Sequence, residues 1–118
     1  MKPIIEWARD WEVGLDTSRE KEVSEALVNI FTEYWTEESI ADKSKSTKNR
    51  NRSALHALGG HIVEEVVTHS NIETDAMRLV LEYIGSDGGP LVYQNEESWQ
   101  KELDVVCRKL YKYLQRKC

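Results

Sequence analysis

The sequence predicts an all-α protein, a compact bundle of four to five helices with one glycine-rich loop. Apolar residues recur at three- and four-residue spacing along most of the chain, and polar or acidic residues that cap helices precede several of these segments. No segment makes a convincing strand. A chain of 118 residues, 40% hydrophobic and 31% charged, suits one domain. We therefore expect residues 1–118 to form a single helical domain.

The first third of the chain contains one strongly amphipathic segment and one ambiguous one. Residues 18–36 place five apolar residues on one helix face: Val23, Leu27, Ile30, Phe31 and Tyr34. Thr17 or Ser18 is the expected N-cap. Residues 4–11 also have helical spacing, although their letters IIEW would equally suit a short edge strand. Residues 36–42 are expected to form a short helix or to extend the preceding one.

A longer helix is predicted over residues 47–69, where Leu55, Ile62 and other apolar residues share one face. Gly59 and Gly60 lie inside it, and each glycine costs about 1 kcal/mol relative to alanine in a helix interior. Either the helix is interrupted there, or another segment packs closely against it.

Two more helices are predicted in the last third of the chain, over residues 71–85 and 97–117. The first has Asn71 as its expected cap, and the second has a cationic end that complements the helix dipole. Residues 85–95 between them read GSDGGPLVYQN, which is typical of a turn-rich loop.

Charge is distributed in blocks along a chain whose formal net charge is −5. Residues 1–42 sum to −7, residues 43–60 to +5, residues 61–104 to −8 and residues 105–118 to +5. Neither positive block contains an acidic residue. The second block sits where the helix dipole favours cations, so a structural role is favoured for it. The alternative is that both blocks converge on one anion-binding surface. The first block has no such explanation.

The first positive block is the candidate binding site, formed by Lys43, Lys45, Lys48, Arg50 and Arg52. Its last three cations fall in the first turns of a predicted helix, where the dipole disfavours them by about 0.3–1 kcal/mol. With Ser46 and Thr47 beside them, they suit a phosphate or carboxylate group of a nucleic acid or an acidic protein. Pairing with acids of the same chain or of a second subunit is the alternative. A helix-turn-helix fits poorly, because Lys45 and Asn51 occupy positions that usually hold glycine and an apolar residue.

The sequence pattern for a metal site is weaker than the pattern for the basic binding site. His61, Glu65 and His69 recur every fourth residue along one helix edge and could supply two ligands of a metal site. All three cannot reach one ion, because they span about 12 Å of a straight helix.

Cys107 is expected to be a core residue, and the four tryptophans are expected to build the core and interfaces or to line a ligand pocket. No phosphate-binding, nucleophile-elbow or zinc motif occurs, so no cofactor is predicted.

The sequence has no secretory signal pattern and no apolar run long enough to span a membrane. We therefore expect a cytoplasmic protein without membrane contact.

Three segments carry a resemblance: LHALGG followed by VEE, then DGGPLVY, then ELDVVCRKLYKYL. Over about residues 43–116 the chain resembles short uncharacterised helical proteins of mobile bacterial genomes, of the gene-cassette or prophage type. The resemblance implies an accessory protein, and it assigns no functional residues.

Three functional hypotheses follow. The first is a non-catalytic interaction module that binds an anionic partner through residues 43–52. The second is a self-associating homodimer whose aromatic faces are buried and whose charge blocks pair between subunits. The third is a small metal-dependent enzyme using His61, Glu65 and His69.

Overall fold

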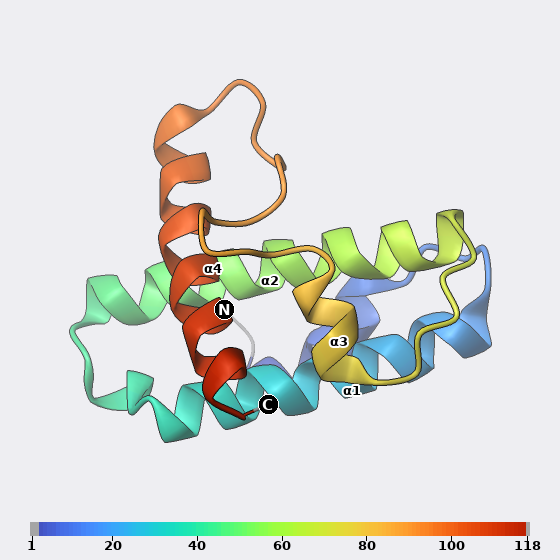
Figure 1. Cartoon of the computed structure of the whole chain (residues 1–118), viewed down its shortest axis with the longest axis horizontal. Helices are drawn as coiled ribbons and strands as arrows, with labels where there is room; N and C mark the ends of the chain where they lie inside the picture. Colours follow the sequence, from blue (N-terminus) through green and yellow to red (C-terminus); the bar gives the residue numbers. More distant parts are fainter. Residues whose placement is uncertain (1–2, 118) are drawn as a thin grey trace.

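The fold is built on a hairpin of two long helices, α1 (Thr17–Glu37) and α2 (Lys45–Thr68), in a computed structural model that describes residues 3–117. The two helices lie side by side and run in opposite directions (Figure 1). The short 3-10 helix η2 (Ile40–Asp42) turns the chain between them. Asp16, rather than Thr17 or Ser18, caps α1 by accepting a hydrogen bond from the Arg19 N–H at 3.1 Å.

The N-terminal segment forms the 3-10 helix η1 (Ile4–Trp11), so the helical alternative for residues 4–11 is confirmed. It packs against both helices of the hairpin and lies behind them in Figure 1. Trp7 and Trp11 are buried, and the Trp11 indole N–H donates to the His56 carbonyl of α2 at 3.0 Å. Helix α2 continues through Gly59 and Gly60 without interruption. The Trp11 ring lies against Gly59 where a Cβ would clash, so close packing of another segment accounts for this glycine.

Helix α3 (Ala76–Leu81) is much shorter than the helix predicted over residues 71–85. Asp75, and not Asn71, is its N-cap, with Oδ1 accepting from the N–H groups of the second and third helical residues. The Asn71 side chain instead closes a turn by accepting from the Glu73 N–H at 2.9 Å. Arg19 of α1 holds this turn by donating to the Asn71 and Glu73 carbonyls. Residues 71–75 therefore form a tethered loop.

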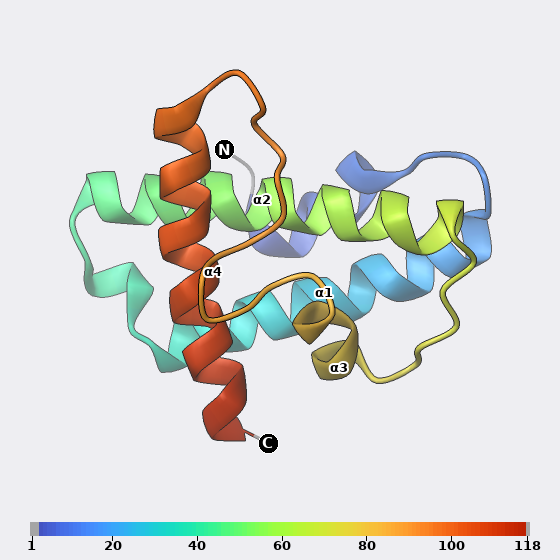
Figure 2. The same cartoon turned by 45° about the horizontal axis from the view of Figure 1, so that its top comes forward.

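Helix α4 (Glu97–Lys117) crosses the hairpin steeply, with its first turns extending beyond α2 and its last turns beside α1 (Figures 1 and 2). The loop of residues 85–95 folds back onto it. Gln100 holds this loop by accepting from the Val92 and Tyr93 N–H groups, each at 3.0 Å, and by donating to the Pro90 carbonyl at 2.9 Å.

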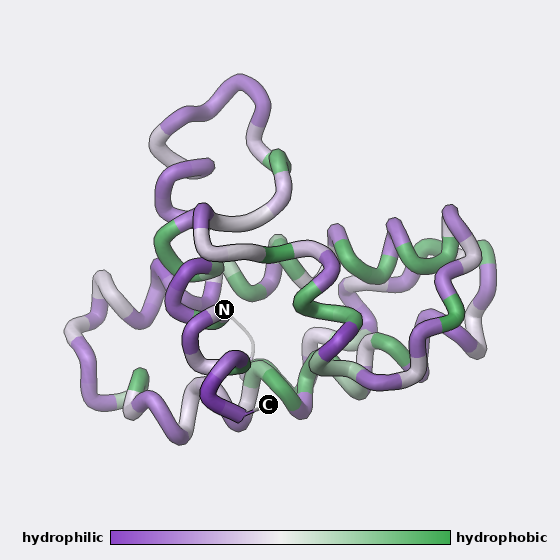
Figure 3. The backbone as a smooth tube through the Cα atoms, viewed as in Figure 1, coloured by the Kyte–Doolittle hydropathy of each residue, from purple (hydrophilic) through white to green (hydrophobic). Residues whose placement is uncertain are grey.

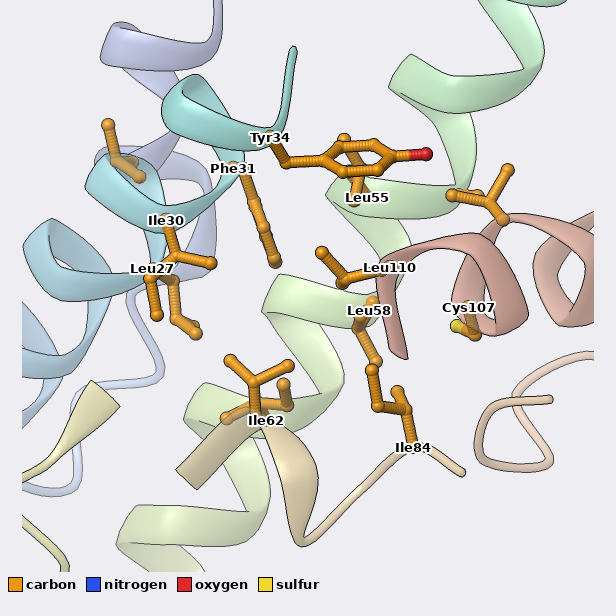
Figure 4. Packing of buried hydrophobic residues seen from close by; sticks show 14 of the residues in the cluster. Leu27, Ile30, Phe31, Tyr34, Leu55, Leu58, Ile62, Ile84, Cys107 and Leu110 are labelled. Carbon is orange, nitrogen blue, oxygen red and sulfur yellow. The ribbon is translucent and has the colours of Figure 1, made fainter. Parts of the chain in front are cut away.

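The core lies where α1, α2, α3 and α4 meet, and Figure 4 shows side chains from the first two helices facing Cys107 and Leu110 of α4. Cys107 is fully buried, as predicted. Within residues 3–117 the only β pairing is an isolated bridge between Gly85 and Gly88, and there is no strand. The molecule measures 37 × 32 × 28 Å. The predicted all-α fold class is thus confirmed.

Candidate functional site: a cationic pocket between η2, α2 and α4

Cations from both positive blocks line one pocket of about 270 Å³. Lys43 comes from the first block, and Lys109, Lys112 and Arg116 come from the second. The remaining lining residues come from α1, η2 and the start of α2: Tyr34, Glu38, Ile40, Thr47 and Asn51. We call this site the cationic pocket. In Figure 3 the backbone of the turn before α2 and of the last turns of α4 is coloured mostly as hydrophilic.

Local structure places each cation. Lys43 follows η2 directly, and its N–H donates to the Ile40 carbonyl at 3.0 Å, which fixes its backbone at the entrance to α2. Lys109, Lys112 and Arg116 follow one another at spacings of three and four residues, so they project from one side of α4. The crossing of α4 over the hairpin brings that side to η2 and the start of α2.

The floor of the pocket is polar but fully hydrogen-bonded. The buried Tyr34 hydroxyl donates to Asn51 Oδ1 at 3.1 Å, and Asn51 Nδ2 donates to the Thr47 carbonyl at 2.9 Å. Burial, together with the charge of Glu38, raises the pKa of Tyr34 to about 12. The phenol is therefore neutral at physiological pH, and it adds no negative charge to the pocket.

The cations differ in whether an acid already compensates them. Arg116 pairs with Glu38, which lies in the pocket. In the part of the chain that the structure describes, Lys43, Lys109 and Lys112 have no carboxylate oxygen within 4.0 Å. Three positive charges thus face one concave surface without an internal counterion. Such an arrangement attracts an anionic group from solution.

The other predicted basic residues lie outside the pocket. Arg50 faces Glu102 of α4, with 3.7 Å between Nε and Oε1, and Arg52 stacks over the Trp35 ring at 5.2 Å. Lys45 is exposed on the first turn of α2 and Lys48 is half-buried. The five cations therefore do not share one face, and Lys43 alone lines the cationic pocket.

The N-terminus of α2 is already capped. Ser44 Oγ accepts from the Thr47 N–H at 3.3 Å, and the Ser44 hydroxyl donates to Thr47 Oγ1 at 3.0 Å. Ser46 also lies within hydrogen-bond distance of Ser44, at 3.2 Å. The Thr47 N–H, the Thr47 hydroxyl and Ser46 are thus already hydrogen-bonded, so the side-chain cations, and not the helix N-terminus, define the pocket.

The histidine candidates keep their expected spacing on α2 but do not converge. Glu65 lies between the two imidazoles, 2.9 Å from His69 Nε2 and 4.0 Å from His61 Nε2. His61 packs edge-on against Tyr83, with 6.1 Å between the ring centroids. Across residues 3–117, no group of three or more histidine, cysteine or acidic side chains is arranged to hold a metal ion.

Cys107 has the properties of a core residue. Burial, with a contribution from the charge of Asp104, raises the pKa of its thiol to about 12. The thiol is therefore protonated at neutral pH, and a protonated buried thiol is a poor nucleophile.

The sequence predicts Lys43 as part of a binding site, whereas for Lys109, Lys112 and Arg116 it favours an interaction with the helix dipole. Only the last of these lies in the final turn of α4, where the dipole acts. The signal available in the sequence was that Lys109 and Lys112 precede that turn and that their segment contains no acid.

Comparisons of the chain with protein-family models, with curated proteins and with solved structures find no match. The resemblance to proteins of mobile genomes therefore stays a prediction. None of the helices within residues 3–117 combines the length and the apolar character needed to cross a membrane.

Proposed function

We propose that the protein is a non-catalytic interaction module that binds an anionic partner in the cationic pocket. The observation that carries this proposal is the convergence of Lys43, Lys109 and Lys112, from segments more than 60 residues apart, on one concave surface. Folding does not require these cations there, because each lacks an acidic partner among the described residues. An accessory role in a mobile bacterial genome is part of the proposal and rests on the resemblance alone.

The acidic remainder of the chain supports a local site. Outside the two positive blocks the charge sums to −15, from −7 in residues 1–42 and −8 in residues 61–104. A polyanion is therefore repelled by most of the molecule and attracted at one corner. This distribution favours one defined contact over general adhesion to anions.

The experiment measures binding of labelled polyanions, an oligonucleotide and a poly-glutamate peptide, by fluorescence anisotropy at several salt concentrations. We expect affinity for at least one of them to fall as salt rises. The double variant Lys109→Gln/Lys112→Gln should weaken that binding about tenfold, since exposed charge pairs contribute up to about 1 kcal/mol each.

The matched control is Lys21→Gln/Arg78→Gln, which removes the same two charges from exposed positions on α1 and α3. It should leave the affinity nearly unchanged. Equal weakening by both double variants would show that net charge, and not the cationic pocket, governs binding. Absence of salt-dependent binding to either polyanion would refute the proposal.

A further inference from the structure

A second hollow, of about 260 Å³, lies between the start of α2, the start of α4 and the loop of residues 85–95. Tyr93 and Trp99 form its aromatic walls, and the buried Ala54 and Leu103 form its floor. The side chains of Arg50 and Glu102 lie at its rim, each about half exposed. We call this site the aromatic hollow.

Trp99 is unusually exposed for a tryptophan, with 55% of its surface accessible. Its ring meets Tyr93 edge-on, with centroids 5.6 Å apart and an interplanar angle of 78°. Tyr93 is held in place because its N–H donates to Gln100 Oε1, one residue along α4 from Trp99. The two rings therefore form a fixed aromatic surface rather than a mobile loop tip.

The rim of the aromatic hollow and the cationic pocket share one stripe of α4. Glu102, which borders the hollow, is followed at seven-residue intervals by Lys109 and Arg116, which line the pocket. Seven residues make about two turns, so these positions fall on one stripe of the helix. Ten residues separate Trp99 from Lys109, which is about 15 Å along the axis. About four stacked nucleotides at 3.4 Å each span that distance.

We infer that the anionic partner is a single-stranded nucleic acid, whose bases stack on Trp99 and Tyr93 while its phosphates contact Lys43, Lys109 and Lys112. This inference rests on the proposed function and specifies its partner. Proteins that bind single strands combine an aromatic surface for the bases with cations for the backbone. A duplex is disfavoured, because its bases are stacked on one another and cannot reach an aromatic wall.

The aromatic hollow distinguishes a nucleic acid from an acidic peptide. An acidic peptide lacks flat faces for the two rings, and its carboxylates cannot donate a hydrogen bond to Glu102. A nucleobase brings a flat face together with ring or amino N–H groups, which can donate hydrogen bonds to the Glu102 carboxylate. Arg50 beside it supplies a cation for the adjoining phosphate.

The test compares three labelled ligands by fluorescence anisotropy: a dodecathymidylate, an abasic oligonucleotide of the same length and a poly-glutamate peptide. The dodecathymidylate should bind most tightly. Trp99→Ala should weaken its binding about 5- to 150-fold, the range for loss of one base stack, and should leave the abasic ligand unaffected. Lys109→Gln/Lys112→Gln should weaken binding of both oligonucleotides. Ile72→Ala, which truncates an exposed apolar side chain on the distant loop of residues 71–75, should change none of these affinities.

Tryptophan fluorescence gives an independent readout, because stacking of a base quenches the exposed Trp99. The quench seen with the wild-type protein should disappear in Trp99→Phe, while binding is largely retained. Equal affinity for the normal and abasic oligonucleotides, or no effect of Trp99→Ala, would overturn the inference and leave the proposed function standing. Lysine-dependent binding of poly-glutamate alone would likewise overturn the inference and leave the proposed function standing. If none of the three ligands binds, the proposed function itself fails.

Discussion

Glu20 is the acidic residue most closely tied to the backbone. It is buried, and its two carboxylate oxygens accept from the N–H groups of four consecutive residues, 13–16, at 2.6–3.0 Å. These hydrogen bonds hold the pKa of Glu20 at about 2, well below its ordinary 4.5. Glu20 thereby fixes the turn between η1 and α1, where Gly14 adopts a positive φ of 91°.

Because the folded pKa of Glu20 lies below the unfolded value, its contribution to stability is present above about pH 4.5 and is lost as the pH falls toward 2. We expect Glu20→Gln to lower the melting temperature by several degrees at pH 7, since an amide cannot accept from all four donors. The variant should also lose less stability than wild type between pH 4.5 and pH 2. Thermal melts followed by circular dichroism at several pH values measure both effects.

Glu25→Gln is the matched control, because Glu25 is exposed on the same helix. Its melting curves should follow those of wild type at each pH. Parallel curves for the Glu20 and Glu25 variants below pH 4.5 would contradict the role assigned to the Glu20 carboxylate.

At the scale of elements, the contact between η1 and α2 depends on Gly59. A Cβ at this position would lie 2.2 Å from Trp11 Cζ2. Gly59→Ala would improve helix propensity by about 1 kcal/mol, but overpacking in a core costs about 1–3 kcal/mol. At so short a distance the cost should exceed the gain, and we expect the free energy of unfolding in urea to fall by about 1–2 kcal/mol.

Gly60→Ala gives the comparison, since its Cβ would lie 3.3 Å from Trp11 Cδ1, a distance that a small ring shift can relieve. Its loss should be smaller than that of Gly59→Ala, or stability should increase. If Gly59→Ala stabilised the protein as an unhindered helix substitution does, the packing of Trp11 on α2 would be wrong.

Elements with a long apolar repeat could be predicted from the sequence, and those fixed by single polar contacts could not. The helix over residues 18–36 was predicted within one residue at each end of α1. The helix over residues 71–85 was wrong in extent, because Arg19 binds the carbonyls of the preceding turn and Asp75 offers a better cap. Arg19 lies 52 and 54 positions before Asn71 and Glu73 in the chain. Contacts over such separations leave no periodic pattern in the sequence.

The same limit applies to the cationic pocket. The two positive blocks were visible as runs in the sequence, but their meeting depends on the steep crossing of α4 over the hairpin. Helix periodicity gives the face of α4 that is buried and says nothing about the angle at which that helix packs. The sequence therefore predicts Lys43 as a binding residue and leaves open whether the cations of α4 join it.

At the scale of the whole molecule, the cationic pocket is a local positive surface on a protein that is acidic elsewhere. Part of the positive charge of the second block is compensated within the chain, because Arg116 and Lys117 pair with Glu38 and Glu37 of α1. Lys43, Lys109 and Lys112 remain available to the acidic surface of a second copy. The homo-oligomer predicted from the sequence would then form by a contact between unlike surfaces, which salt weakens.

We expect self-association at micromolar concentration in about 0.01 M salt, where the Debye length is about 30 Å, and dispersal at 0.15 M, where it is about 8 Å. Sedimentation velocity at the two salt concentrations measures it. An added oligonucleotide should disperse the oligomer at low salt, because it competes for the same lysines, and Lys109→Gln/Lys112→Gln should sediment as a monomer throughout. A wild-type monomer at low salt would eliminate this mode of association. An oligomer that persists in high salt would instead indicate an apolar interface. The exposed Ile5 and Leu15 are candidates for residues of that interface.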